Sequence, residues 1–312
     1  MTVPAPRRFG PLLQGALGPD EGDVRLDEPL APRITVRVGG PAEAWLRPRT
    51  LGGLETALRL ARAEGQALTL LGGGANTLVG DGGVAGLTVS LPTDLFPEEI
   101  QKDDAGARLT LCAGSAINRL IVVMRKQGLV GAEFLAGIPG TLGGAVAMNA
   151  GTKMGECMSI VEAVEVATAD GVGWLSLAEL PHRYRHTELP PGGVVTRVRF
   201  HVPFGDMAES QAKMEADLGY RKRTQPLSLP NFGSVFKNPE GDHAGRLIEL
   251  AGLKGHTVGR AQISQLHANW IVNLGGATAR DITTLISDAQ RRVAEQGGIQ
   301  LQPEVKRVGT FT

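Results

Sequence analysis

The sequence predicts an α+β protein, and three observations lead to that class. Apolar positions that repeat every two residues and apolar positions that repeat every 3.6 residues are intermixed, without strict alternation of strand and helix. Glycine, at 43 of 312 residues, is about twice as frequent as usual, which indicates many tight turns or close backbone approaches. The length predicts about two domains, and the texture of the sequence changes near residue 205.

Composition excludes several classes of partner. Lys+Arg 32 and Asp+Glu 32 balance, so no net field attracts nucleic acid or an anionic membrane. The two cysteines, Cys112 and Cys157, form neither a disulfide framework nor a zinc cluster, and they indicate reduced thiols in the cytoplasm. The uncharged stretch 134–152 is rich in glycine, so we interpret it as a loop and not as a membrane span. No metal site is expected.

The N-terminal part begins with a segment rich in proline, glycine and acidic residues, and we expect residues 1–30 to be a flexible lead-in. A short alternating strand is expected at 34–38, ended by the glycines that follow. Thr50 is expected to cap a helix that ends at Gly65, because apolar residues follow at spacings of three and four. Further strands are expected at 67–71, 87–91 and 109–113.

In the middle of the chain, apolar residues again repeat with the spacing of helices in some segments and of strands in others. Ser115 is expected to cap a helix that ends before Gly128, and a glycine-rich loop follows at 137–151. At 194–202, apolar residues alternate with basic and polar ones, which predicts a half-buried antiparallel strand. Two more strands are expected at 161–168 and 173–176.

After residue 205 the pattern changes, and we place a domain boundary there. Thr278, with Asp281 three residues later, forms a capping-box pattern at the start of a long helix. The tail at 299–308 has the pattern of extended chain. Other helices are expected at 206–221 and 244–251, and strands at 233–237 and 269–273.

Two glycine-rich segments could hold a phosphate-bearing ligand. The first, at 72–78, leaves a predicted strand, where backbone N–H groups without side chains can converge on a diphosphate. It lacks the G-x-G-x-x-G of dinucleotide folds and the Lys-Ser/Thr of a P-loop, so alone it fits a structural turn equally well. The second, at 137–151, offers Thr141 and Asn149 as polar contacts; a close helix crossing through small residues is the alternative.

Eight segments in one order resemble the bacterial UDP-N-acetylenolpyruvoylglucosamine reductases, flavoenzymes of peptidoglycan precursor synthesis. The resemblance covers roughly 33–309, nearly the whole chain. It is carried by Gly72-Gly73-Gly74-Ala75-Asn76-Thr77-Leu78 and by residues 138–151, 184–187, 233–239, 244–249, 252–255, 267–269 and 303–305.

The resemblance implies an FAD-binding region of two lobes, at 31–90 and 91–205, followed by a substrate-binding domain at 206–312. It implies non-covalent FAD, NADPH as reductant, and reduction of UDP-N-acetylglucosamine enolpyruvate to UDP-N-acetylmuramate. The implied protein is a cytoplasmic monomer with a small UDP-sugar as its substrate. The residues implied to bind FAD are Gly72, Gly73, Gly74, Ala75, Asn76, Thr77, Leu78, Ile138, Pro139, Gly140, Thr141, Gly143, Gly144, Asn149, Ala150 and Gly151.

Three residues match the catalytic positions of the family. Reduced FAD is implied to give a hydride to the CH₂ carbon of the substrate, so negative charge develops on the neighbouring carboxylate. Arg185 is implied to hold that carboxylate, because its planar fork can bind it bidentately. Ser234 is implied to give a proton to the adjacent carbon, and a protonated Glu304 to donate a hydrogen bond to the enediolate. Without the resemblance, a solvated arginine, a turn serine and a surface glutamate are the simpler interpretations.

Four residues are implied to contact the UDP part of the substrate: Arg223, Asn238, Lys254 and His267. Family members commonly carry a basic residue directly before Gln-Pro, where this chain has Thr224, so either Arg223 replaces it from one position away or this substrate contact is absent. The stretch 187–194 is short and has no tyrosine. We therefore expect the form of the family that lacks a tyrosine-bearing lid.

Two other functions remain open at this stage. Another flavin oxidase or dehydrogenase would keep both glycine-rich segments but would have no use for Ser234 together with Glu304. A nucleotide-binding module without catalytic activity would bind a UDP-sugar and would carry no yellow chromophore.

Overall fold

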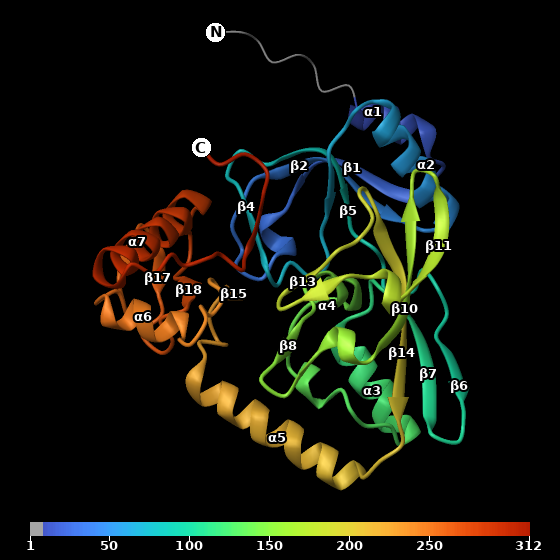
Figure 1. Ribbon diagram of the computed structural model, residues 1–312. Helices are drawn as coiled ribbons and strands as arrows, with labels where there is room; N and C mark the ends of the chain where they lie inside the picture. Colours follow the sequence, from blue (N-terminus) through green and yellow to red (C-terminus); the bar gives the residue numbers. More distant parts are fainter. Residues whose placement is uncertain (1–8) are drawn as a thin grey trace, which may run out of the picture. The chain divides into compact units, whose positions relative to one another are not determined.

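The computed structural model describes residues 9–312, which form two compact units (Figure 1). Unit 1 consists of residues 9–26, 43–73 and 86–218. Unit 2 consists of residues 27–42, 74–85 and 219–312. Each unit is therefore built from several stretches of the chain.

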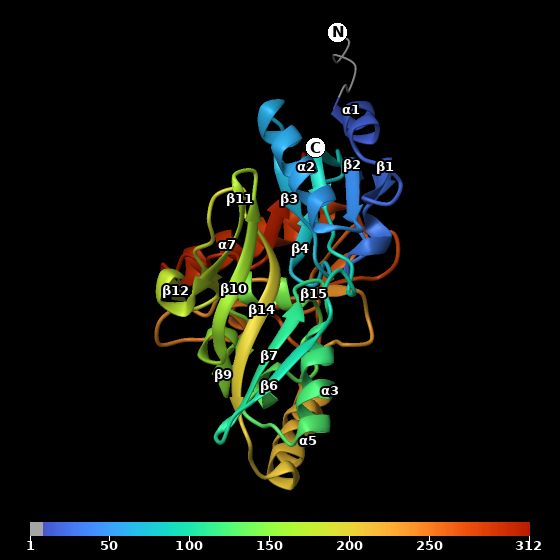
Figure 2. The same cartoon turned by 90° about the vertical axis from the view of Figure 1, so that its right-hand side faces the viewer.

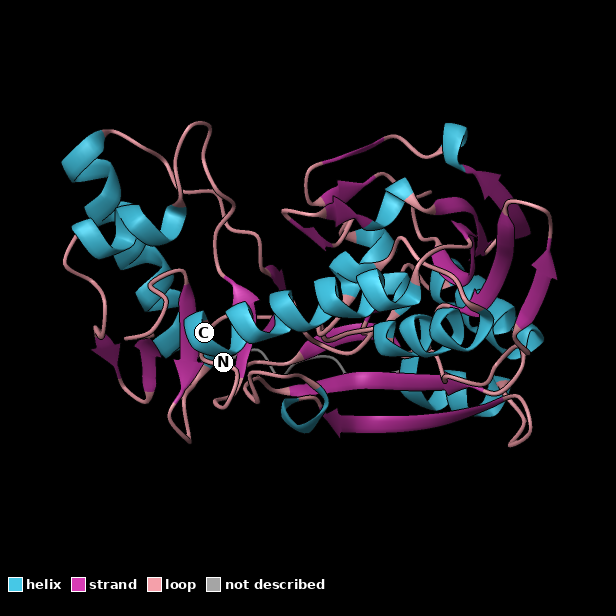
Figure 3. Ribbon diagram, turned by 90° about the horizontal axis from the view of Figure 1, so that it is seen from below, coloured by secondary structure: helices cyan, strands magenta, loops and turns pink. Residues whose placement is uncertain are grey.

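The predicted boundary near 205 is displaced in the structure. The last crossing from unit 1 to unit 2 falls at 218/219, inside helix α5 (Met207–Thr224). This helix lies at the bottom of the view in Figure 1, and Figure 3 shows it without a break. The change of composition near 205 marks the start of this polar helix. The division of the FAD-binding region into lobes at 31–90 and 91–205 stays a prediction.

The described part of the N-terminal segment, from Phe9, has regular secondary structure. It forms helix α1 (Phe9–Ala16) and strand β1 (Gly22–Pro29). Phe9, Leu13 and Leu17 are buried at successive i, i+4 positions in the same core as Leu54 of the next helix. The predicted flexible lead-in is therefore wrong for 9–30, and its residues 1–8 lie outside the described part of the chain.

The first sheet of unit 1 has the strand order β1-β2-β5-β3. Helix α2 (Leu51–Ala63) packs on it through Leu54, Leu58 and Ala61, at the predicted spacing. The Thr50 hydroxyl accepts a hydrogen bond from the N–H of Gly53 at 3.0 Å, which confirms the predicted cap. The other strands are β2 (Pro41–Pro48), β3 (Leu68–Leu70) and β5 (Val84–Val89).

The second sheet of unit 1 has five strands in the order β11-β10-β14-β7-β6, each antiparallel to its neighbour (Figure 2). Val198, Phe200 and Val202 of β14 are buried and the alternate residues are not, as predicted. The strands are β6 (Glu99–Lys102), β7 (Gly106–Cys112), β10 (Val161–Thr168), β11 (Gly171–Ser176) and β14 (Val194–Pro203).

Helix α3 (Ile117–Gln127) packs in the core of this second sheet. It ends at Gly128 with φ +73°, as predicted. The predicted cap is wrong: the Ser115 hydroxyl donates to the carbonyl of Thr93 at 3.1 Å, and the helix begins after Ala116 without a side-chain cap.

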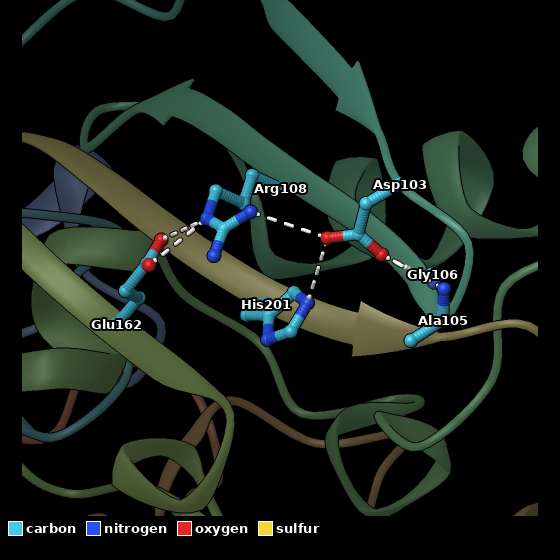
Figure 4. A network of polar contacts seen from close by, with 6 residues as sticks. All are labelled: Asp103, Ala105, Gly106, Arg108, Glu162 and His201. Atoms are coloured by element: carbon cyan, nitrogen blue, oxygen red, sulfur yellow. Dashed lines mark hydrogen bonds and ion pairs between the residues drawn. The ribbon is translucent and has the colours of Figure 1, made fainter.

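The second sheet also carries a polar network (Figure 4). One oxygen of the Asp103 carboxylate accepts the N–H groups of Ala105 at 3.0 Å and Gly106 at 2.8 Å. Its other oxygen lies 3.1 Å from Arg108 Nη1 and 3.4 Å from His201 Nε2. Arg108 also donates to Glu162, which lies on β10.

Unit 2 is built on a four-stranded sheet in the order β15-β18-β17-β16. Thr278 and Asp281 form the predicted capping box at the start of α7. The elements are β15 (Asn231–Ser234), α6 (Ala244–Leu250), β16 (Thr257–Val258), β17 (Ala261–Ile263), β18 (Trp270–Asn273) and α7 (Ala279–Gly297), with β19 (Lys306–Val308) parallel to β4 (Thr77–Val79).

The strand predicted at 34–38 is a turn. A 3-10 turn at Ala31–Arg33 precedes it, and Arg37 has φ +58°. Its polar groups bond to distant chain: the N–H of Thr35 donates to Gly74, and the Asn273 side chain donates to the carbonyl of Val36 at 2.9 Å. The alternating burial is real, but no strand among residues 9–312 pairs with this segment. No helix described over residues 9–312 is long and apolar enough to cross a membrane.

Candidate active site

The starts of the two glycine-rich segments touch each other within unit 1. A Cβ atom at Gly72 would lie 2.4 Å from Thr141 Oγ1, and one at Gly73 would lie 2.8 Å from the Cα of Gly140. Side chains at these positions would push the segments apart, so glycine is required for the contact. Gly72 and Gly73 are exposed, which leaves bare backbone available to a ligand.

The second segment contains a short helix that the sequence did not indicate. Helix α4 (Leu142–Ala147) begins at Thr141, whose hydroxyl accepts the N–H of Gly144 at 3.3 Å. Gly144 is exposed, whereas a Cβ at Gly143 would lie 3.1 Å from the Cβ of Ala113. The face of the segment at Gly143 is thus packed tightly against Ala113, and the exposed face at Gly144 carries no side chain. An extended cofactor requires such an open face.

The rest of the first segment belongs to unit 2. Gly74 has φ +61°, and a Cβ there would lie 2.6 Å from the Cα of Ile34. The Asn76 side chain donates to the carbonyl of Glu304 at 3.2 Å, and its own carbonyl accepts the N–H of Lys306 at 3.0 Å. The segment that carries Asn76 therefore lies beside the segment that carries Glu304.

Arg185 occupies the turn of a small hairpin in unit 1, formed by β12 (His182–Arg183) and β13 (His186–Thr187). Its backbone has φ +57°, a conformation that costs a side-chain-bearing residue about 1–2 kcal/mol. Its Nη2 donates to the carbonyl of Gly151 at 2.8 Å, and its guanidinium lies 4.7 Å from the centre of the Tyr184 ring. The arginine is half-buried and has a fixed direction.

Asn149 joins the second glycine-rich segment to this hairpin. It is fully buried, with φ +40°. Its Nδ2 donates to the carbonyl of Arg183 at 3.3 Å and to the Glu156 carboxylate, and its Oδ1 accepts the N–H of Met158 at 3.1 Å. Its side chain thus bonds to the protein, including strand β9 (Gly155–Glu156), which pairs with β8 (Gly151–Thr152). A direct contact of this side chain with FAD stays a prediction.

Ser234 ends strand β15, directly after a bulge. Asn231 pairs with Val272 and Ser234 with Trp270, so β15 has one more residue than β18 between the two pairs. Gly233, inside the bulge, has φ +78°. The bulge sets the direction of the half-buried Ser234.

Glu304 lies next to the chain that follows Ser234. Its N–H donates to the carbonyl of Val235 at 2.8 Å, and the N–H of Lys237 donates to the carbonyl of Gln302 at 2.9 Å. The structure therefore brings Ser234 and Glu304 onto neighbouring segments of unit 2, in agreement with the expectation that their side chains meet at one site. Arg185 belongs to unit 1.

Three of the residues expected to contact the UDP group gather around helix α6. The Asn238 side chain accepts the N–H of Ala244, the first residue of this helix, at 3.1 Å. Lys254 Nζ lies 2.9 Å from the Glu249 carboxylate. This ion pair is exposed, so a phosphate could replace Glu249 as the partner of Lys254. Burial, followed by the charge of Lys254, lowers the pKa of His267 and so favours the neutral imidazole. Arg223, the fourth, is exposed in the last turn of α5.

The glycine-rich segments fit an FAD. Bare backbone at Gly72, Gly73 and Gly144 gives a long cofactor a surface without side chains. The predicted residues Ala75, Ile138, Pro139 and Ala150 lie within the same two segments and present no charge to a diphosphate.

Comparison with known families gives two matches. Residues 42–174 match the family described as "FAD binding domain". Residues 225–308 match the family described as "UDP-N-acetylenolpyruvoylglucosamine reductase, C-terminal domain".

Individual relatives cover nearly the whole chain. The chain is 68% identical to the UDP-N-acetylenolpyruvoylglucosamine reductase of Myxococcus xanthus over 93% of both proteins, and 55% identical to that of an Anaeromyxobacter species over 93% of this chain and 90% of the relative. A solved reductase of the same name from Thermus caldophilus has a TM-score of 0.76 at 37% identity, over 92% of this chain and 99% of that chain. The BBE-like 1 protein of Physcomitrella patens, at 13% identity and TM-score 0.54, shares the fold alone, over 91% of this chain and 88% of that chain.

Proposed function

The chain belongs to the UDP-N-acetylenolpyruvoylglucosamine reductase family, and on that premise we propose that Arg185, Ser234 and Glu304 are its catalytic residues. The enzyme uses FAD as cofactor and NADPH as reductant, and it reduces UDP-N-acetylglucosamine enolpyruvate to UDP-N-acetylmuramate. When bound, FAD supplies the hydride for this reduction.

Arg185 binds the carboxylate of the enolpyruvyl group. A guanidinium has several N–H donors in one plane, so it can bind a carboxylate while its bond to Gly151 persists. That bond and the contact with the Tyr184 ring restrain the guanidinium before the substrate arrives. Arg185 then stabilises the negative charge that develops on the carboxylate during reduction.

Ser234 gives its hydroxyl proton to the carbon next to that carboxylate. A serine hydroxyl is a weak acid, but the carbon of an enediolate is strongly basic, so a short, aligned transfer is sufficient. Glu304, in its protonated form, donates a hydrogen bond to the enediolate oxygen. The observation that supports these roles most strongly is the 2.8 Å bond from the Glu304 N–H to the Val235 carbonyl, because it holds the two side chains on adjoining segments.

The experiment that tests the assignment separates the two half-reactions in Ser234→Ala. We expect flavin reduction by NADPH to continue at the wild-type rate and reoxidation by the enol ether to fall by about 10²–10⁴, the usual contribution of a general acid. Ser228→Ala, at an exposed serine of the same unit, is the control and keeps both rates. Unchanged reoxidation in Ser234→Ala would remove Ser234 from the mechanism.

For the UDP group, we propose contacts with Arg223, Asn238, Lys254 and His267. The grouping of three of them around α6 supports this, since a point charge and an amide suit a diphosphate. Replacement of Lys254 by Met should raise the KM for the enol ether and leave NADPH reduction unchanged.

We also propose that the enzyme is a cytoplasmic monomer. Both cysteines are buried and unbridged, as in proteins of a reducing compartment. A mass near 33 kDa in solution, close to the 32.8 kDa of one chain, is the expected result of light scattering.

A further inference from the structure

Asn269 makes three hydrogen bonds with the chain that follows Ser234 and a fourth with His267. Its Oδ1 accepts the N–H of Phe236 at 3.0 Å, and its Nδ2 donates to the carbonyl of Phe236 at 2.8 Å. Its backbone carbonyl accepts the N–H of Val235 at 2.9 Å, and its backbone N–H donates to His267 Nδ1 at 3.2 Å. The residue is buried, so solvent does not compete for these bonds.

The two side-chain bonds to Phe236 take the place of a strand partner on the side of β18, while Phe236 pairs with Pro303 on its other side. The bulge at Gly233 breaks the register between β15 and β18, and the strand β15 ends at Ser234. Beyond it, the Asn269 amide bonds both backbone groups of Phe236, as a neighbouring strand would. The two residues after Ser234 are thereby held by Asn269.

The same stretch also carries Glu304. The Val235 carbonyl accepts the N–H of Glu304, while the Val235 N–H donates to Asn269. One peptide segment, 235–236, therefore lies between Asn269 on one side and the Glu304 backbone on the other. A shift of this segment would move Ser234 and Glu304 together.

We propose that Asn269 is a positioning residue for proton transfer: its side-chain amide fixes the 235–236 segment and so aims the Ser234 hydroxyl at the substrate carbon. The inference rests on the proposed role of Ser234 as proton donor. Asn269 acts through the backbone of Phe236 and need not touch the substrate. A displacement near 1 Å at a reacting group can lower a rate by about 10²-fold.

Asn269→Asp is the most selective variant. It keeps an oxygen for the N–H of Phe236 but places a second oxygen against the Phe236 carbonyl, where the amide donated a hydrogen bond. Asn273→Asp is the matched control at the other end of β18. The Asn273 side chain is also buried and bonds to backbone on both sides, accepting from Gly275 at 2.8 Å and donating to Val36.

The experiment measures four quantities for each variant: the melting temperature, the rate of flavin reduction by NADPH, the rate of reoxidation by the enol ether, and the Kd of the enol ether from its perturbation of the flavin spectrum. We expect both variants to melt earlier and both to be reduced normally. Only Asn269→Asp should slow reoxidation, by about 10- to 100-fold, with a Kd within threefold of wild type.

Reoxidation at the wild-type rate in Asn269→Asp, or equal slowing in Asn273→Asp, would overturn the inference. If Asn269→Asp does not fold, Asn269→Ser, which removes the bidentate contact without adding charge, takes its place with the same expectation. Ser234→Ala in the same series keeps the two proposals apart. If Ser234→Ala reoxidises normally, the role of Ser234 fails; if it is slow and the Asn269 variants are fast, only the positioning role fails.

Discussion

The Arg185 guanidinium donates from Nη2 to the carbonyl oxygen of Gly151 across 2.8 Å. Gly151 ends the glycine-rich segment whose start, at Gly140 and Thr141, touches Gly72 and Gly73. The proposed carboxylate-binding arginine and the proposed cofactor-binding backbone are therefore parts of one continuous packing arrangement within unit 1. Substitutions in the two places should nevertheless affect different half-reactions.

Arg185→Ala should slow reoxidation of the flavin by the enol ether by about 10²–10³-fold, the usual loss when a group that stabilises developing charge is removed. Flavin reduction by NADPH should be unaffected. Stopped-flow absorbance under anaerobic conditions measures both rates. Arg183→Ala, an exposed arginine of the same hairpin, is the control, and equal slowing in both variants would count against a specific role for Arg185.

Gly73→Ala should lower the flavin content of the purified protein. The new Cβ would lie 2.8 Å from the Cα of Gly140, so the two glycine-rich segments must separate, and overpacking of this kind costs about 1–3 kcal/mol. The ratio of FAD to protein from the visible spectrum measures the effect. Gly173→Ala, where a Cβ meets nothing within 4 Å, should keep its flavin. A full complement of FAD in Gly73→Ala would show that these segments do not form the cofactor site.

Gly233→Ala tests whether the bulge aims Ser234. A Cβ there has open space, so the cost comes from the backbone, where φ +78° disfavours alanine by about 1 kcal/mol. Gly298→Ala, at the end of α7 with φ +67° and equally open space, carries the same cost away from Ser234. Both should lose similar stability in urea, and only Gly233→Ala should slow reoxidation. Equal reoxidation rates would contradict the role of the bulge.

The Asp103 network predicts an acid-dependent part of the stability. Hydrogen bonds from the N–H groups of Ala105 and Gly106 hold the pKa of Asp103 below its usual 3.8, with smaller contributions from His201 and Arg108 (Figure 4). Because the pKa is lowered on folding, the stabilisation is present at neutral pH and is lost as the pH falls below about 4. Asp103→Asn should thus melt earlier than wild type at pH 7, with the gap narrowing at pH 3. If the two melting temperatures differ by the same amount at pH 7 and pH 3, the ionisation of Asp103 does not contribute to stability in this way.

Local sequence signals predicted the elements whose cap residues and apolar spacing lie within the element itself. The helices capped by Thr50 and Thr278 follow from a cap residue plus apolar spacing, and β14 follows from strict alternation. The turn at 34–38 has the same alternation, but its backbone bonds to Gly74 and Asn273, which are distant in the sequence. The periodicity of apolar residues indicates which side chains are buried, but it does not indicate which groups form hydrogen bonds with the backbone N–H and C=O.

The site was predicted through short motifs, and its internal geometry was not. The family resemblance identified Arg185, Ser234 and Glu304, because each lies in a recognisable segment. The pairing of Glu304 with Val235, and the contacts of Asn269, depend on which distant strands meet and where a bulge falls. In α1, by contrast, the spacing of Phe9, Leu13 and Leu17 is a local signal that the proline- and glycine-rich composition obscured.

The most direct test of the catalytic assignment is one anaerobic experiment on wild type and Ser234→Ala. The yellow protein is bleached with one equivalent of NADPH, the enolpyruvyl nucleotide is added, and the flavin absorbance is followed. We predict rapid return of the oxidised spectrum with one equivalent of UDP-N-acetylmuramate in the wild type, and persistent bleaching in Ser234→Ala. A wild-type flavin that stays reduced until oxygen enters, or a variant that recovers as fast as the wild type, would contradict the account.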